Sequence, residues 1–446
     1  MIKNLDNILS GIKIKKNNLF FFFFMALYVG FLAIVKAGLL GSLSLIFVAL
    51  ITFYFSRYYK SLVTILYVAL CVRLVTIFFG NFLVILPDSW GDATFFELRA
   101  WEYSQDGFFG VLSYFPSDKS SLYLSWILAF FYSLTDRSVI MGQSLSLLFG
   151  MGSVLLGSRL AHKIWSEKIS IKVGWILALY PTLVLYSCLI LREAYVWFFL
   201  LVALYGIVCW SKSGGFKTII ITFIGFSGAT FFHGGMFVGG FIFLTILTIT
   251  SFIIILKRFF YLKISINSLV MLGFSIITII FLVLNSDSIP KIGSLKNMFN
   301  VDRLLIEISN RNINAAAFPA WTVPKTEFEF IYKAPIRIIY FMFSPFPWDV
   351  NKTAHLFGLF DGMFHIMLFI LFIKNFKSIW SDRTLRIILI ILASYLIVYG
   401  LATGNFGTGL RHRTKLIIVS ILMVAPWIPQ LVFFDKKQRN TDNKKL

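Results

Sequence analysis

The chain carries little charge for its length: only 14% of its 446 residues are Asp, Glu, Lys or Arg, whereas 58% are hydrophobic. A soluble globular domain has about 25% charged and roughly 45–50% apolar residues. An ordinary soluble enzyme and a disordered chain are therefore both excluded. With 51 Phe residues and a mean hydropathy of +0.83, the sequence predicts an all-α polytopic membrane protein.

Cysteine is also scarce. Cys71, Cys188 and Cys209 lie in or beside apolar stretches and show no CxxC spacing. The sequence therefore encodes neither a disulfide framework nor a thiolate metal site. We expect these thiols to be small buried hydrophobic groups, and we expect no metal ion or other cofactor.

Acidic residues are few, since 20 of them stand against 41 Lys and Arg and give a net charge of +21. The basic residues lie mostly in short segments between apolar runs, where they retain loops at the anionic cytoplasmic leaflet. The partner that this charge indicates is the lipid bilayer, and no nucleic acid is expected.

Apolar runs long enough to cross a bilayer recur along the chain. A hydrocarbon core of about 30 Å needs about 20 apolar residues per helix. We predict about 12 transmembrane helices within a single integral membrane domain, 1–446, with two shorter apolar pieces, 121–135 and 336–346, as re-entrant or surface helices. The predicted spans are 19–36, 39–56, 61–80, 138–158, 172–189, 191–210, 217–232, 234–256, 266–285, 355–374, 384–402 and 414–433.

The distribution of Lys and Arg predicts which loops face the cytoplasm. The tail 435–446 carries five basic and two acidic residues and is expected inside. Alternation of the spans then places the other basic connections inside as well: 57–60, 159–172, 211–217, 257–265 and 374–383. The segment 88–120 has six acidic and two basic residues, which fits the external face.

Two external segments, 81–137 and 286–354, are much longer than the other connections. Connections beyond about 15 residues are usually functional when they are ordered. The first is expected to hold amphipathic helices, and the second holds Trp, Tyr and Pro residues suited to the membrane interface.

Ionisable residues gather at the external ends of the predicted spans. Such groups at membrane depth are costly and indicate function. Carboxylates with a His and several Arg suit a phosphate-bearing substrate and a hydroxyl that must lose its proton; the alternative is a set of interfacial ion pairs, such as Arg192 with Glu193 or Asp92 with Arg411. The gathered residues are Asp88, Asp92, Arg192, Glu193, His233, Arg411, His412 and Arg413.

Two carboxylates are the catalytic candidates. Asp92 precedes an amphipathic stretch with Phe95 and Phe96, and it would either cap that helix or act as the general base that deprotonates an acceptor hydroxyl during attack on an anomeric carbon. Asp88, four residues earlier, would position the acceptor or a divalent metal ion, although the ligand spacing does not support a metal. Two carboxylates alone do not make a metal site.

The remaining candidates would bind substrate. Arg411 and Arg413 follow a Gly-rich turn at a predicted helix start, which is a ready anion site, although both could instead snorkel to head groups. Arg192 and Glu193 interrupt an apolar run, where they would bind substrate or pair with each other. His233 would donate to a phosphate or a sugar hydroxyl, or satisfy a helix end. His162, His355 and His365 are interpreted as structural.

The segment GDATFFELRAWEYSQDGF resembles the first external loop of the GT-C superfamily of polyprenyl-phosphate-dependent glycosyltransferases. Asp92, Phe96, Ala100 and Gly107 match its recurring positions, although the family usually has Tyr where this chain has Phe96. The segments ALYPTLVLYSCLILREA and GLRHRTKLIIVSILMVAP resemble two later motifs of that superfamily.

A second resemblance covers 187–245, which is similar to the exopolysaccharide and O-antigen repeat-unit polymerases at Arg192, Lys212, Lys217 and His233. Both resemblances imply a GT-C-like fold and an active face outside the cytoplasmic (inner) membrane. They also imply an undecaprenyl-linked sugar donor, a glycan acceptor and contact with polysaccharide assembly proteins.

The expected function is therefore a membrane glycosyltransferase of bacterial surface polysaccharide, either a single-sugar transferase or a repeat-unit polymerase. The alternative is a flippase or transporter of lipid-linked oligosaccharide. Transporters usually carry internal repeats and polar residues near the midplane; the sequence shows no repeat, and its polar groups gather at one surface.

Overall fold

The structure is a computed structural model of the chain and describes residues 24–28, 30, 38–116, 122–259, 266–284, 301–311, 316–350 and 353–429. Within these ranges the regular elements are all helices, with one isolated bridge between Ala317 and Asn405, so the all-α prediction is confirmed. The predicted cytoplasmic tail, 435–446, and most of the first predicted span, 19–36, lie outside the described residues.

Seven described helices are long and apolar enough to cross a membrane. Their lengths follow from uninterrupted apolar runs of about 20 residues, the number that a bilayer core requires. They are α3 (Leu39–Tyr58), α4 (Val63–Phe82), α8 (Val139–Ile164), α11 (Glu193–Ser213), α13 (Phe237–Phe259), α18 (Thr353–Lys374) and α20 (Arg383–Ala402).

Four other predicted spans correspond to helices that are broken, shorter or more polar, so the count of 12 spans is not confirmed. Pro181 divides the predicted span 172–189 into α9 (Glu167–Leu179) and α10 (Pro181–Tyr186), because Pro cannot continue a helix at that point. The predicted spans 217–232 and 266–285 correspond to α12 (Phe216–Phe232) and α14 (Ile266–Leu284), whose apolar parts are shorter. The predicted span 414–433 overlaps α21 (Phe406–Val424), which carries several basic residues.

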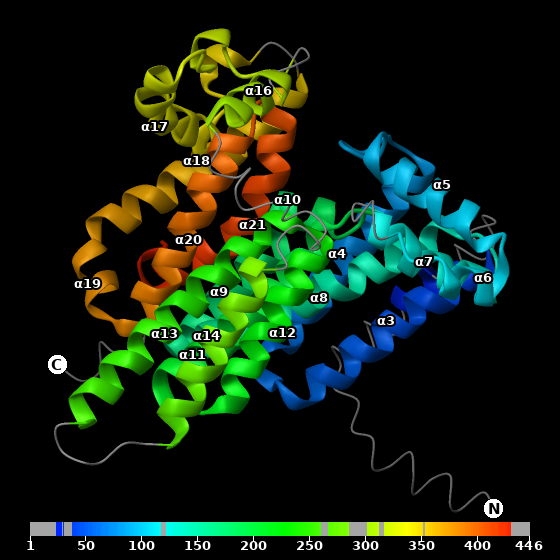
Figure 1. The fold of residues 1–446 in the computed structure, drawn as a ribbon. Helices are drawn as coiled ribbons and strands as arrows, with labels where there is room; N and C mark the ends of the chain where they lie inside the picture. The colour runs from blue at the N-terminus through cyan, green and yellow to red at the C-terminus, as the bar shows by residue number, and fades with distance from the viewer. Residues whose placement is uncertain are drawn as a thin grey trace, which may run out of the picture.

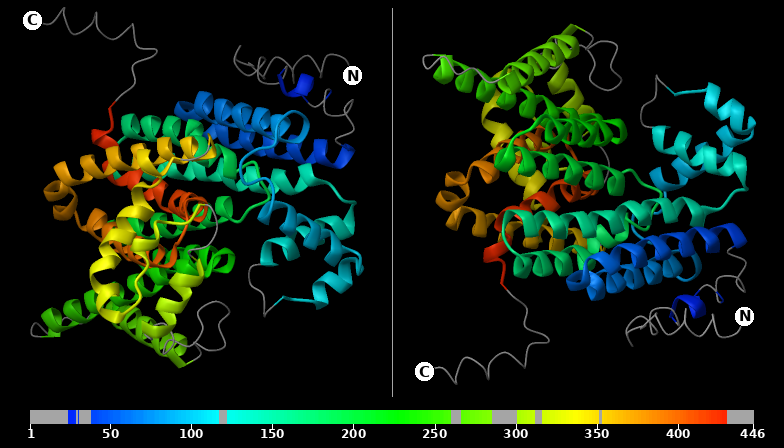
Figure 2. Two further views of the ribbon diagram at one scale, coloured as in Figure 1. Left: turned by 90° about the horizontal axis from the view of Figure 1, so that it is seen from above. Right: turned by 90° about the horizontal axis from the view of Figure 1, so that it is seen from below.

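The predicted first external segment, 81–137, holds three short helices: α5 (Asp92–Ser104), α6 (Gly107–Ser113) and α7 (Tyr123–Leu134). With 12 residues, α7 is only about 18 Å long and cannot cross the bilayer, as expected for 121–135. The three helices stand together at one side of the bundle (Figure 2).

A buried carboxylate joins α5 to the start of α8. Glu97 is 4% exposed and accepts two hydrogen bonds from Arg137, at 2.9 Å from Nε and 2.7 Å from Nη2. The hydroxyl of Tyr132 on α7 also donates to Glu97. The side-chain hydrogen bonds with Glu97 raise the pKa of Arg137 above its ordinary value, because they stabilise the protonated guanidinium. Glu97 therefore fixes α5 and α7 against the bundle.

The second long segment, 286–354, contributes α16 (Val301–Arg311) and α17 (Glu327–Phe343). The predicted short piece 336–346 is mostly the second half of α17. Arg337 on that half is fully buried and donates to the backbone carbonyls of Leu401 and Thr403 at the end of α20. In Figure 1 these helices and α5 lie in the upper half of the molecule.

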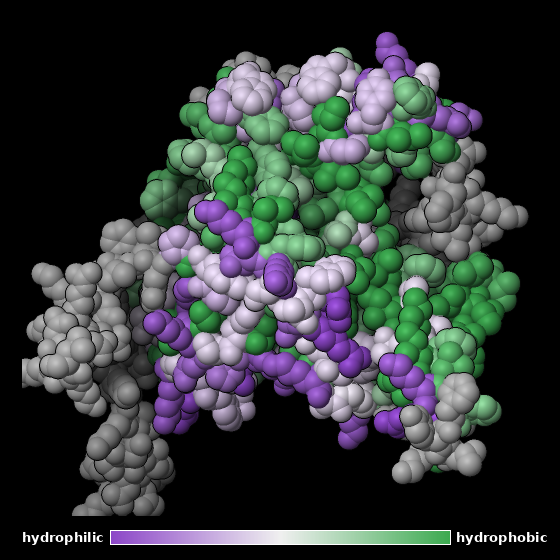
Figure 3. Space-filling model, turned by 90° about the vertical axis from the view of Figure 1, so that its left-hand side faces the viewer, coloured by the Kyte–Doolittle hydropathy of each residue, from purple (hydrophilic) through white to green (hydrophobic). Residues whose placement is uncertain are grey.

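The outer surface has the polarity that a bilayer requires. Figure 3 shows a mainly hydrophobic band above a lower region in which hydrophilic residues gather. Lys374, Lys377 and Arg383, at the α18–α20 connection, are exposed. The basic lower end of the bundle is therefore the end that the positive-inside rule predicts at the cytoplasmic side, and the end with α5 and α17 is the one predicted outside.

This sidedness predicts a labelling pattern for single cysteines placed at exposed positions. In a chain without its three native cysteines, Gln105→Cys and Thr408→Cys should react with a membrane-impermeant maleimide in spheroplasts. Lys377→Cys, equally exposed, should react only after lysis. Labelling of Lys377→Cys in intact spheroplasts, or of the other two only after lysis, would reject the orientation.

Candidate functional site

The site is organised around the first turns of α21. Asn405 begins this helix, since its side chain accepts a hydrogen bond from the backbone of Thr408 at 2.8 Å, the capping expected of Asn. The sequence then places Arg411, His412, Arg413 and Lys415 within two turns. Successive helix residues point in different directions, so these basic side chains reach different neighbours.

Arg411 lies between two acidic side chains from different helices. Its Nη1 atom is 2.7 Å from Oδ2 of Asp92, the first residue of α5. Its Nε atom is 3.4 Å from Oε1 of Glu193, the first residue of α11. Lys415, one turn later, is 3.7 Å from the same Glu193 oxygen. One basic turn of α21 therefore joins two helix starts that lie far apart in sequence.

Asp92 does not cap its helix. The capping position is Gly91, whose φ of +73° is a conformation that glycine adopts readily, and no side-chain cap bond is made there. Asp92 instead pairs with Arg411 and leaves its carboxylate 52% exposed. The capping role considered from the sequence is therefore wrong for Asp92. The ion pair with Arg411, also considered from the sequence, is present.

Asp88 is held by a separate contact. Its φ is +57°, which Asp tolerates better than most residues. Its Oδ2 accepts a hydrogen bond of 2.7 Å from the hydroxyl of Tyr186 at the end of α10. Tyr186 is fully buried while Asp88 is exposed, so the buried ring positions a carboxylate at the surface.

Arg192 and Glu193 belong to a buried connection between α10 and α11. Arg73 on α4 supports the connection through a 2.9 Å bond to Ser187. The guanidinium of Arg192 lies 5.1 Å from the ring centre of Phe96 on α5, and its buried Nε has no hydrogen-bond partner within the described residues. Glu193 turns toward α21, so these neighbours do not form the ion pair considered from sequence.

His233 lies between α12 and α13 and contacts the same region. Its Nδ1 is 2.9 Å from the hydroxyl of Tyr399 on α20. Its ring centre lies 5.0 Å from that of His412, the residue after Arg411. The described structure therefore brings Asp88, Asp92, Arg192, Glu193, His233 and Arg411 to one end of the bundle, the end that the sequence predicts outside.

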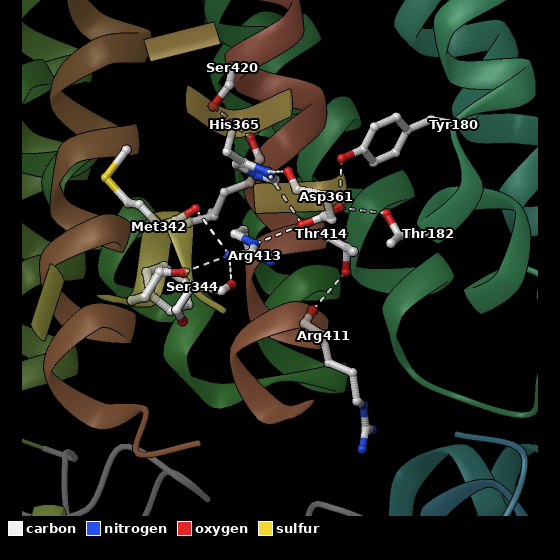
Figure 4. A network of polar contacts seen from close by, with 12 residues as sticks. Tyr180, Thr182, Met342, Ser344, Asp361, His365, Arg411, Arg413, Thr414 and Ser420 are labelled. Carbon is white, nitrogen blue, oxygen red and sulfur yellow. Dashed lines mark hydrogen bonds and ion pairs between the residues drawn. The ribbon is translucent and has the colours of Figure 1, made fainter. Parts of the chain in front are cut away.

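Arg413 lies in a different network (Figure 4). It is 2% exposed, and its Nε is 2.8 Å from Oδ2 of Asp361 on α18. Its Nη1 donates to three backbone carbonyls where α17 ends: those of Phe341, Met342 and Ser344. Arg411 and Arg413 therefore do not form one clamp.

Asp361 completes this network and was missed by the sequence analysis. Its Oδ1 accepts hydrogen bonds from Tyr180, at 2.6 Å, and from Thr182, at 3.3 Å, at the break between α9 and α10. Nδ1 of His365 lies 2.9 Å from the backbone oxygen of Asp361. An acidic residue inside the apolar run 355–374, with a His one turn later, was the available signal.

Within the described ranges no group of three or more His, Cys, Asp or Glu side chains could hold a metal ion.

No family model matches the chain, and neither the curated proteins nor the solved structures contain a match to it.

The Arg413 network predicts a large stability effect. Arg413→Ala would leave Asp361 buried without its cationic partner, and breaking a buried pair in this way costs about 3–5 kcal/mol. Thermal unfolding of the purified protein in detergent should show a clear drop in melting temperature. Arg99→Ala, which removes an exposed ion pair with Glu102, is the control and should melt with the wild type. Unchanged melting of Arg413→Ala would contradict the bracing role.

Proposed function

We propose that the protein is a membrane-embedded glycosyltransferase that uses a polyprenyl-phosphate-linked sugar or oligosaccharide in the assembly of bacterial surface polysaccharide. The observation that carries the proposal is the contact between the half-exposed carboxylate of Asp92 and Arg411. It brings a carboxylate and a guanidinium side by side at one end of the bundle; in this proposal the carboxylate is the base and the guanidinium binds the phosphate. Glycosyl transfer from a phosphate donor needs both groups.

The reaction assigns a role to each charge. The acceptor hydroxyl attacks the anomeric carbon of the donor and forms the new glycosidic bond. Asp92 takes the proton of that hydroxyl. The bond between the anomeric carbon and the phosphate oxygen breaks, and the phosphate leaves with the electron pair. Arg411 and Arg192 stabilise the negative charge that develops on the leaving phosphate.

The cluster holds three cations, Arg192, Arg411 and Lys415, and three carboxylates, Asp88, Asp92 and Glu193. Its net charge is balanced, so the support for an anionic ligand comes from the geometry of Arg411. The partly buried guanidinium of Arg411, 18% exposed, offers the forked donor geometry that suits phosphate. In this proposal Asp88, which accepts a hydrogen bond from Tyr186, orients the acceptor.

The setting of this reaction is the outer face of the cytoplasmic membrane. The donor is an undecaprenyl-linked sugar, the acceptor is a glycan, and the product passes to polysaccharide assembly proteins. The same chemistry serves single transfer and repeat-unit polymerisation, which differ only in the size of donor and acceptor.

A flippase or transporter is the second candidate, and one observation favours it. The Asp361–Arg413 pair is buried beside the helix break at Pro181, and broken helices with buried charges are typical of transporters. Bonds from Arg413 to three backbone carbonyls, however, suit a fixed brace. The exposed pair at Asp92 therefore supports the transferase better.

Asp92→Asn tests the catalytic role directly. Loss of a well-placed general base costs about 10²–10⁴-fold in rate, so a deletion strain carrying this variant should make almost no glycan at normal protein levels. Asp88→Asn should be milder, because Asp88 only orients the acceptor. Asp106→Asn, an exposed acid in the same segment, is the matched control. Near-normal glycan from Asp92→Asn at equal protein levels would reject the assignment.

Arg411→Lys tests the phosphate contact. Lysine keeps the positive charge but lacks the planar fork, and at a forked site it does not replace arginine. Glycan output should fall by about tenfold or more while the amount of protein in the membrane stays the same. Arg99→Lys makes the same exchange at an exposed arginine on α5 and is the control; it should leave glycan output unchanged. Full output from Arg411→Lys would reduce Arg411 to a charge at the membrane interface.

A further inference from the structure

The two carboxylates that share Arg411 have opposite environments. Glu193 is 2% exposed, whereas Asp92 is 52% exposed. A carboxylate that loses its counter-charge in a buried position is strongly destabilised. One at the surface is stabilised by water and loses little.

The geometry adds to this asymmetry. Arg411 uses Nη1, at the end of its side chain, for Asp92 at 2.7 Å, and Nε, nearer the backbone, for Glu193 at 3.4 Å. The terminal nitrogens can therefore change partner while Nε stays beside Glu193. Lys415, 3.7 Å from Glu193, contributes to holding that carboxylate in place.

A second cation faces the same point. Arg192 precedes Glu193 in the chain and lies against Phe96, one turn after Asp92 on α5. Its Nε is buried and has no hydrogen-bond partner among the residues that the structure describes. The charges of Arg192 and Arg411 act on each other, so an anion that binds at Arg411 is also attracted by Arg192.

We propose that Asp92 and the phosphate of the donor compete for Arg411, with Glu193 as the positioning residue that holds Arg411 through the exchange. Before the donor binds, Arg411 neutralises Asp92. When the phosphate binds, the terminal nitrogens of Arg411 move to it, and Asp92 is released to accept the proton of the acceptor hydroxyl. The base thus becomes free only when a donor is present. This inference rests on the proposed function.

Competition between Asp92 and phosphate for Arg411 predicts whether phosphate affinity rises or falls when the charge of Asp92 is removed. If Arg411 must leave Asp92 to bind phosphate, removal of the Asp92 charge should tighten phosphate binding while it abolishes transfer. If Asp92 merely supports the fold around Arg411, the same change should weaken binding or leave it unaltered. Plain repulsion between Asp92 and the phosphate would also tighten binding in Asp92→Asn, but that gain would persist when Arg411 is replaced. A gain that requires Arg411 is expected only under the proposed exchange.

The probe is farnesyl phosphate, a short polyprenyl monophosphate, titrated into the full chain in nanodiscs by calorimetry. Asp92→Asn should bind it about two- to fivefold more tightly, the range that loss of an exposed ion pair implies. Arg411→Gln should weaken binding at least tenfold. Asp106→Asn removes an equal charge from the same segment without contacting Arg411 and should change affinity less than twofold.

Two further variants isolate the exchange. In Arg411→Gln combined with Asp92→Asn, the tightening should disappear, because the two residues no longer compete. Glu193→Gln should weaken binding, since Arg411 loses the group that holds it. Parallel titration with inorganic phosphate shows whether the site takes free phosphate or needs the lipid chain; weaker binding of inorganic phosphate supports a lipid-linked ligand.

The outcomes separate this inference from the proposed function. Weaker or unchanged binding in Asp92→Asn, with Arg411→Gln still impaired, would overturn the exchange and leave the phosphate site intact. Binding of farnesyl phosphate that does not depend on Arg411, or no binding by the wild type, would contradict both.

Discussion

The constraint on which this structure depends is that a charge removed from water must find a partner within the protein. Within the bilayer, unpaired charge is too costly to persist, yet the first turns of α21 carry Arg411, Arg413 and Lys415. Their partners come from α5, α11 and α18. The position of α21 among these helices is therefore fixed by charge as well as by apolar packing.

Arg413 and Arg411 differ in their partners: the partners of Arg413 are all enclosed, whereas one partner of Arg411 lies at the surface and can be exchanged. Arg413 is enclosed, with Asp361 and three carbonyls as partners, and suits a brace between α17, α18 and α21. Arg411 has one buried partner and one exposed partner. Only the second arrangement leaves a guanidinium that an incoming anion can reach, and for this reason the proposed chemistry is centred on Arg411.

The sequence predicts the helices, because these depend on apolar runs along the chain. It does not predict every side-chain partner, because partners depend on the direction in which each side chain points. Long apolar runs gave α3, α4, α8, α11, α13, α18 and α20, and the short run at 121–135 gave α7. The pairing of Asp92 with Arg411 was considered because their charges are opposite. Asp361 as the partner of Arg413 was not predicted, since helix residues two apart face different neighbours. The break at Pro181 likewise divides the apolar run 172–189, which the sequence predicts as one span.

The most direct measurement of the central claim is an experimental structure of the full chain with bound farnesyl phosphate. We expect a phosphate oxygen within hydrogen-bond distance of the Arg411 guanidinium, and an Asp92 carboxylate that has moved away from Nη1, to which it is 2.7 Å in the present structure. Phosphate bound away from Arg411, or bound there while the Asp92 contact is kept, would contradict this claim.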